Sequence, residues 1–323
     1  MEKRKLSREV IHIISRFSNW SASGVAKSLE EDGVWASRTA WERFLQWFLL
    51  GVGAAFMVAG IFFFFAFNWE DMPKFVKMGI VEGLVLACIA AYFLPKLNKL
   101  SKDILLTAAA VLIGAFFAVF GQVYQTGANA FDLFLGWVVF AFLWAIVSGF
   151  PPLWLFLLLV ANTSAVLYFQ QIARYMNVGT LSNGLFLANM AIVVLVEWLR
   201  TRNVLHYPAK WFTQTVTFAA VTSMTFNIGF HIFEHQREGT LVTSLAIAAV
   251  VYSLGIWYGM TRKSLFYVAI FPFSLIMIVS CFIIKPVNDP IQVFLLVAVF
   301  IVVSTTILVS TLIQLNKTWH ELN

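Results

Sequence analysis

Residues 104–124 read ILLTAAAVLIGAFFAVFGQVY, a run of 21 residues without a charged side chain. An α-helix rises 1.5 Å per residue, so about 20 apolar residues are enough to cross the roughly 30 Å hydrocarbon core of a bilayer. This run therefore predicts a membrane-spanning helix.

The rest of the 323-residue chain has the same character. It is 60% hydrophobic and only 12% charged, whereas soluble domains carry about a quarter charged residues. Breaks rich in Pro, Gly and charge separate further apolar runs. Together with residues 104–124, there are ten apolar runs. They are approximately 45–67, 75–94, 104–124, 131–149, 151–169, 181–199, 211–233, 240–259, 264–284 and 290–314. The sequence predicts an all-α polytopic membrane protein with about ten transmembrane helices.

The net charge of +6 has a topological explanation. If the amino terminus is cytoplasmic, 17 of the 22 Lys and Arg residues fall on the cytoplasmic side, as expected from the bias of cytoplasmic loops toward basic residues. This distribution predicts that both termini are cytoplasmic and argues against nucleic acid as a partner. We expect a multi-pass protein of the bacterial inner (cytoplasmic) membrane, surrounded by membrane lipids.

We divide the chain into residues 1–43, a cytoplasmic helical or amphipathic element, residues 44–160, the first membrane helices, and residues 161–323, the second group. In the first part, apolar residues from Leu6 to Phe17 recur at helical spacing, and a second short helix is expected from Ser21 or Ser23 to Gly33. Residues 24–45 weakly resemble a helix-turn-helix, but its second helix would enter the bilayer at Leu45. We favour an interfacial or partner-binding hairpin.

Glu82 is the sharpest candidate for function within a predicted span. It lies about 10 Å below the outer end of the second span by helical rise, between Gly79 and Gly83, small residues that allow another helix to approach closely. Ionisable groups inside a membrane are functional candidates by default. Glu82 either exchanges a proton or accepts hydrogen bonds from a neighbouring helix, and both interpretations are open.

A second candidate group lies on the predicted outer face. Its residues come from the end of the first span, the end of the third span and the start of the fourth span. Gln122 and Gln125 are three residues apart on one helix, so they share a face. Amides, carboxylates and indoles at these ends predict a shallow pocket for a polar or cationic headgroup; an aromatic belt with helix caps is the structural alternative. The candidate binding residues of this pocket are Asn68, Trp69, Gln122, Tyr124, Gln125 and Asp132, with Trp137 nearby.

A third candidate group is a stripe in the seventh span. Ser223, Asn227 and His231 follow one another at i, i+4 and i+8. The stripe fits either a water-lined path or hydrogen bonds between helices, which contribute about 0.6 to 2 kcal/mol each in membranes. Asn162 and Asn189, both placed near mid-membrane, allow the same two interpretations.

No motif for nucleotide, zinc or covalent catalysis is present in the sequence. It lacks Walker A, G-x-G-x-x-G, HExxH, CxxC and nucleophile-elbow patterns. We therefore expect no cofactor, no metal and no catalytic residues, and an enzyme is the less favoured class. A lipid-modifying enzyme that uses Glu82, Asp71 or His231 as acid or base is a third interpretation, without a diagnostic spacing to support it.

Several outer-face segments resemble a known family. Residues 63–69 read FFFAFNW and residues 120–125 read FGQVYQ, followed by Asp132, Trp137, Trp144, Leu153 and Trp154. In this order they resemble the DUF2157 family of bacterial predicted membrane proteins, whose members pair an "AANW"-like end of the first span with a "GQIYQ"-like end of the third. The resemblance covers roughly residues 20–160, and Phe67 stands where a small residue is more usual.

The family is one of unknown function, so the resemblance marks Asn68, Trp69, Gln122, Tyr124 and Gln125 without giving them roles. It also implies, by analogy, a second membrane protein with a GDYxxLxY motif as a possible partner.

Two function hypotheses follow from these patterns. The first is a transporter-like or channel-like protein for a small solute or lipid headgroup, or the membrane subunit of such a complex, with Glu82 as the proton-linked group and the outer-face residues as the binding site. The second is a membrane scaffold or sensor that binds partner proteins through residues 1–43 and its lateral helix faces.

Overall fold

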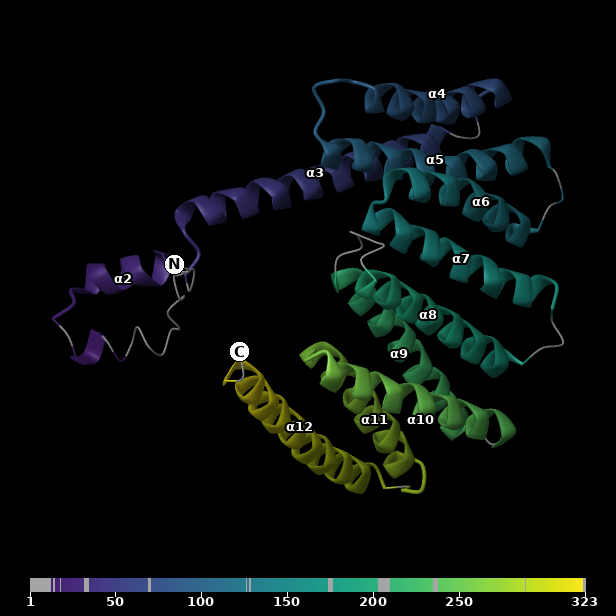
Figure 1. Ribbon diagram of the computed structural model, residues 1–323. Helices are drawn as coiled ribbons and strands as arrows, with labels where there is room; N and C mark the ends of the chain where they lie inside the picture. Colours follow the sequence, from purple (N-terminus) through teal and green to yellow (C-terminus); the bar gives the residue numbers. More distant parts are fainter. Residues whose placement is uncertain are drawn as a thin grey trace. The chain divides into compact units, whose positions relative to one another are not determined.

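The computed structural model describes most of the chain, and every element in its described part is an α-helix (Figure 1). The described residues are 13, 15–17, 19–31, 35–68, 71–125, 127, 129–173, 177–202, 210–234, 238–287 and 289–321. The chain divides into two compact units, Met1–Pro73 and Lys74–Asn323.

The first unit contains α2 (Ala22–Glu31) and α3 (Arg38–Asn68). The Ser21 hydroxyl accepts a 3.2 Å hydrogen bond from the Gly24 N–H and so starts α2, as predicted for the second short helix. Ser37 starts α3 in the same way, 3.1 Å from the Ala40 N–H. The predicted helix from Leu6 to Phe17 and the Gly33 stop lie largely outside the described residues. Helix α3 runs without a break through Leu45, so a separate recognition helix does not form here.

The second unit contains nine helices in its described residues. They are α4 (Lys74–Tyr92), α5 (Lys99–Tyr124), α6 (Ala130–Ser148), α7 (Pro151–Gln171), α8 (Val178–Thr201), α9 (Lys210–Phe233), α10 (Glu238–Thr261), α11 (Leu265–Ile284) and α12 (Pro290–Glu321). Each contains or closely matches a predicted span. Polar caps explain several boundaries: Asn98 starts α5 and Asn177 starts α8 through side-chain hydrogen bonds to backbone N–H groups.

The lengths and composition of the helices confirm an all-α polytopic membrane protein. Among the described residues, α4 to α12 are long and apolar enough to cross a membrane. The remaining predicted span, 45–67, is the first in the chain and lies within α3, where several side chains are outside the described residues. The total of ten and the cytoplasmic placement of both termini stay predictions.

Helices α4 to α7 pack in sequence order, each against the next (Figure 1). A small-residue core lets α5, α6 and α7 approach closely, with Ala110, Ala141 and Ala145 fully buried. Gly114 of α5 lies against the Trp137 ring of α6, where a Cβ atom would stand 2.1 Å from the ring. The Trp137 indole also donates a 2.7 Å hydrogen bond to the Ala110 carbonyl. Trp137 therefore locks two helices together.

The larger core lies in α8 to α11, where α9 contacts α8, α10 and α11. Met224, Ile228 and Ile232 of α9 are fully buried there. Gly255 of α10 makes room for the buried Phe271 ring of α11, 2.1 Å from an added Cβ. Helix α12 packs along α11, and its apolar membrane-length segment contains no buried residue (Figure 1). The core therefore centres on α9.

Candidate functional site

Four predicted outer-face residues lie where α5 ends and α6 begins. Gln122 and Tyr124 are exposed on the last turn of α5, and the Tyr124 ring packs on Phe120 with centroids 4.7 Å apart. The Asp132 carboxylate accepts a 3.0 Å hydrogen bond from the Asn129 N–H. This contact caps α6, because it satisfies a backbone donor before the helix begins. Asp132 thus caps a helix, as the structural alternative for these residues predicted.

Gln125 has an unusual backbone at the same connection. Its φ of 44° places it in the left-handed region directly after α5. Non-glycine residues enter this region at a cost of about 1–2 kcal/mol. The sequence thus keeps a strained glutamine here, and such strain is often retained at functional positions.

Asn68 and Trp69 are not placed against these residues. Asn68 is the last residue of α3, in the other unit, and Trp69 lies outside the described residues. A pocket that joins them to Gln122 stays a prediction.

Glu82 lies on an exposed face of α4, and none of the described residues of this helix is buried. Gly79 and Gly83 have open space where a Cβ atom would stand. Within the second unit the Glu82 carboxylate therefore faces the surface. Its proton-linked role is a prediction that requires another helix or a bound molecule to cover it.

The predicted stripe in α9 divides into residues with different surroundings. Ser223 is exposed. The Asn227 amide donates hydrogen bonds to Asn183 of α8 at 3.3 Å and to Ser244 of α10 at 3.2 Å, and Ser244 donates to Asn183 at 2.9 Å. Asn227 therefore joins three helices, which favours the interhelical interpretation for this residue.

The two mid-membrane asparagines form a pair. The Asn189 amide of α8 donates to the Asn162 oxygen of α7 at 2.7 Å, and the Asn162 amide donates back at 3.2 Å. Each amide also donates to a carbonyl in its own helix. The pair satisfies polar groups that lipid cannot satisfy.

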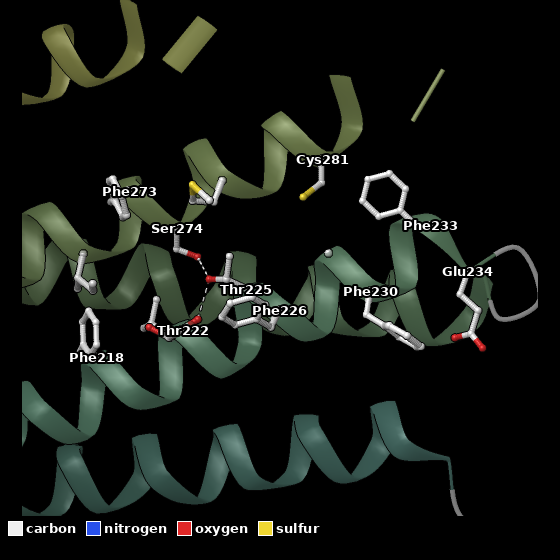
Figure 2. A pocket seen from close by; sticks show the side chains of 14 residues that line it. Phe218, Thr222, Thr225, Phe226, Phe230, Phe233, Glu234, Phe273, Ser274 and Cys281 are labelled. Carbon is white, nitrogen blue, oxygen red and sulfur yellow. Dashed lines mark hydrogen bonds between the residues drawn. The ribbon is translucent and has the colours of Figure 1, made fainter. Parts of the chain in front are cut away.

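A lateral groove with a volume of about 800 Å³ lies between α9 and α11 (Figure 2). Five phenylalanines contribute most of the large side chains, and four of them, Phe218, Phe226, Phe230 and Phe233, are exposed on α9. Gly229 widens the groove opposite Cys281. We call it the α9–α11 groove, and its lining is Phe218, Val221, Thr222, Thr225, Phe226, Gly229, Phe230, Phe233, Glu234, Ile270, Phe273, Ser274, Met277 and Cys281.

Hydroxyl groups hold the two walls of the α9–α11 groove together. Thr225 of α9 and Ser274 of α11 share a 2.6 Å hydrogen bond, drawn as a dashed line in Figure 2. Behind them the Tyr252 hydroxyl of α10 lies 2.9 Å from Ser274. The spacing of the walls is therefore fixed at mid-groove by a contact that links three helices.

One carboxylate stands at the end of the groove. Figure 2 shows Glu234 beyond Phe230 and Phe233, where α9 ends. Its side chain is 33% exposed, and its Oε2 atom lies 3.1 Å from Nδ1 of the buried His231, without the alignment of a hydrogen bond. The His231 ring lies close to Gly179 of α8, where an added Cβ atom would stand 2.5 Å from its Nε2 atom. It is buried in the bundle and does not line the groove.

The sequence prediction missed the α9–α11 groove, although α9 carries a signal for it. Phe218, Thr222, Phe226, Phe230 and Glu234 recur every four residues, which makes them a continuous ridge that winds slowly around the helix. An aromatic stripe that ends in an acid is unlike an ordinary lipid-facing surface. The partner residues on α11, such as Ser274, could not be found without the pairing of the two helices.

Comparison with protein families matches residues 21–154 to the DUF2157 family of predicted membrane proteins. This confirms the family resemblance over the first part of the chain and supports a multi-pass membrane protein. The match includes the Gln122–Gln125 segment and ends before the α9–α11 groove. No curated protein and no solved structure matches the chain.

Proposed function

We propose that this membrane protein is transporter-like and binds an amphipathic organic cation in the α9–α11 groove. One observation carries the proposal: among the described lining residues, Glu234 is the single charged side chain, and it ends a groove with five phenylalanines. The ligand would place its apolar part against the rings and its positive charge toward the carboxylate.

The chemistry of the lining favours a cation over other apolar ligands. The face of an aromatic ring attracts a cation by about 0.5 to 2 kcal/mol, most strongly where water is excluded. A carboxylate adds charge attraction and repels anions. A volume of about 800 Å³ also falls within the roughly 300–1,000 Å³ range of small-molecule sites.

The groove opens laterally, as required for a ligand that partitions into lipid. Phe226 is 74% exposed and Phe230 is 63% exposed, although both belong to a helix long and apolar enough to span a membrane. A ligand dissolved in the acyl chains would reach these rings without crossing water. The Thr225–Ser274 bond fixes the spacing of the walls in advance, which lowers the entropic cost of binding.

Uptake into proteoliposomes tests the transport step. Ethidium is an amphipathic cation that becomes fluorescent when it reaches DNA enclosed in the vesicles. We expect faster uptake with the wild-type protein than with Glu234→Gln or Phe226→Ala. Phe294→Ala is the matched control, because Phe294 is 71% exposed on α12 and does not line the groove. Equal uptake in all vesicles would refute the transport role.

The outer-face residues form a second part of the same proposal. Gln122, Tyr124, Gln125 and Asp132 would meet a solute or headgroup at the α5–α6 connection, Asn68 and Trp69 would bind the same ligand, and Glu82 would be a proton-linked group. The strained Gln125 backbone supports a role for this connection. Unchanged solute flux in Glu82→Gln and Gln122→Ala would remove this part.

A membrane scaffold or sensor is the second candidate function, and α12 favours it. Its membrane-length segment has no buried residue, and Ile291, Phe294 and Val299 are exposed. A partner helix, such as that of the second membrane protein implied by the family resemblance, would cover this face. Pull-down in mild detergent distinguishes the two functions, since a stoichiometric membrane partner that is lost on deletion of residues 1–40 supports the scaffold.

A further inference from the structure

A second cavity lies where five helices end, away from the α9–α11 groove. It has a volume of about 420 Å³ and gathers the carboxyl ends of α8, α10 and α12 with the amino ends of α9 and α11. We call it the basic cleft. Its lining is Glu197, Arg200, Lys210, Thr213, Gln214, Tyr258, Arg262, Lys263, Ser264, Leu265, Phe266, Tyr267, Asn316 and Trp319.

Positive charge dominates the basic cleft. Arg200, Lys210, Arg262 and Lys263 face a single carboxylate, Glu197, among the described lining residues. The formal charge of the lining is therefore +3. Basic residues at helix ends follow from membrane topology alone, but topology does not require four of them to converge on one cavity.

The single carboxylate is already engaged by groups of the protein. Glu197 is 5% exposed and accepts hydrogen bonds from Thr213 of α9 at 2.7 Å and from Tyr258 of α10 at 2.7 Å. The Tyr267 hydroxyl of α11 also donates to it, at 3.4 Å. Glu197 therefore shapes the floor of the cleft and has little capacity left to neutralise the rim.

Arg200 connects this floor to the open space. Its Nη2 atom pairs with Glu197 at 2.5 Å. Its Nη1 atom is buried and has no hydrogen-bond partner among the described residues. Because the Arg200 side chain lines the cleft and is 31% exposed, its guanidinium lies within the site that an anion would enter.

The backbone conformation of Lys263 is a second observation that supports a role for positive charge in the basic cleft. It has a φ of 52° and is the left-handed residue that ends α10. Ser264 N–H donates to the Gly259 carbonyl at 2.8 Å and Lys263 N–H to the Met260 carbonyl at 3.3 Å, the two bonds of a Schellman helix end. Glycine is the usual residue at this position. The chain instead keeps a strained lysine whose side chain lines the cleft.

We propose that the basic cleft is a binding site for a phosphate-bearing anion, held by Arg200, Lys210, Arg262 and Lys263. The phosphate belongs either to a lipid headgroup or to a soluble molecule, and the chemistry of recognition is the same. Trp319 and Phe266 stand beside the charged groups, where they would contact the carbon part of the ligand.

Lys263→Gly is the most informative variant. Because glycine relieves the left-handed backbone while it removes one charge, the helix end should become no less stable and the anion should bind on the order of tenfold more weakly. A residue with a purely structural role would not separate these effects. Lys210→Gln is a second variant with the same expected loss of binding, and Lys285→Gln, exposed at the other end of α11, is the control.

The full-length protein would be tested with two probes. Radiolabelled inorganic phosphate, measured by equilibrium dialysis in phosphatidylcholine nanodiscs, represents a soluble source. Native mass spectrometry after purification with phosphatidylglycerol counts retained anionic lipids and represents a membrane source.

Binding of either probe that is weakened by Lys263→Gly and Lys210→Gln, but not by Lys285→Gln, supports the site and identifies the source. Absence of binding by both probes would overturn the proposal, as would equal loss in the control. In that case the basic residues serve topology alone.

Discussion

The carboxylate of Glu197 on α8 accepts a 2.7 Å hydrogen bond from the Tyr258 hydroxyl on α10, two helices further along the chain. Glu197 also binds Thr213 of α9 and pairs with Arg200 of its own helix. With the Tyr267 hydroxyl of α11 as a further donor, one buried acid connects four helices of the larger core. It fixes the end of the bundle where the basic cleft opens.

Glu197→Gln should lower the stability of the protein by about 2–3 kcal/mol, because Arg200 would lose its charge partner and the amide cannot accept all the hydrogen bonds that converge on the carboxylate. Unfolding in a detergent titration, followed by tryptophan fluorescence, would measure the change. The matched control is Glu42→Gln, since the Arg38–Glu42 pair is largely exposed and should contribute less than about 0.5 kcal/mol. Equal effects of the two changes would refute the structural role of Glu197.

Gly114→Ala should destabilise the α5–α6 contact by about 1–3 kcal/mol. Its new methyl group would meet the Trp137 ring, which is held in place by its hydrogen bond to Ala110. Thermal unfolding monitored by size-exclusion chromatography would detect the loss. Gly184→Ala on α8 is the control, because its Cβ position is open and alanine is the better helix former. A destabilised control with an unaffected Gly114→Ala would contradict this packing.

The Asn162–Asn189 pair should show a coupling free energy of about 1 kcal/mol in a double-mutant cycle with alanine. The two amides exchange hydrogen bonds at 2.7 and 3.2 Å, so each single change already loses the interaction. The measurement is the unfolding free energy of the wild type, both single variants and the double variant. Additive changes would indicate that the pair contributes no specific contact between α7 and α8.

The hydroxyl contact between the walls of the α9–α11 groove predicts an effect on cation affinity. Ser274→Ala should weaken cation binding by about threefold, because Thr225 and Tyr252 lose the hydroxyl that joins them and the groove becomes less preorganised. Ser253→Ala on the exposed face of α10 is the control. Equal affinity for a fluorescent cation in both variants would show that the hydroxyl contact does not shape the groove.

The helices could be predicted almost to their ends, because each uninterrupted apolar run is bounded by residues that cannot stay in lipid. Residues 211–233 were expected and α9 spans Lys210–Phe233. Helix α12 is longer than expected, because residues 315–321 continue the helix beyond the apolar run. The overall class therefore follows from composition and spacing.

The sites were harder to predict, because they depend on which helices are neighbours. Glu197 lies three residues before Arg200, so the sequence alone is consistent with a surface pair at the membrane edge. Its contacts with Tyr258 and Tyr267 arise from residues 61 and 70 positions away. Periodicity places a residue on a helix face, but it does not say which helix that face meets.

The central claim is that the α9–α11 groove binds amphipathic cations through Glu234 and its phenylalanines. Its most direct test is equilibrium binding of tetraphenylphosphonium to the full-length protein in nanodiscs, with triphenylphosphine oxide as the neutral probe of similar shape. We predict that the wild type prefers the cation and that Glu234→Gln loses about tenfold in affinity for it, or about 1.4 kcal/mol, while the neutral probe is unaffected. Equal binding of the two probes to wild type and Glu234→Gln would contradict the claim, since the groove would then be an ordinary lipid-facing surface.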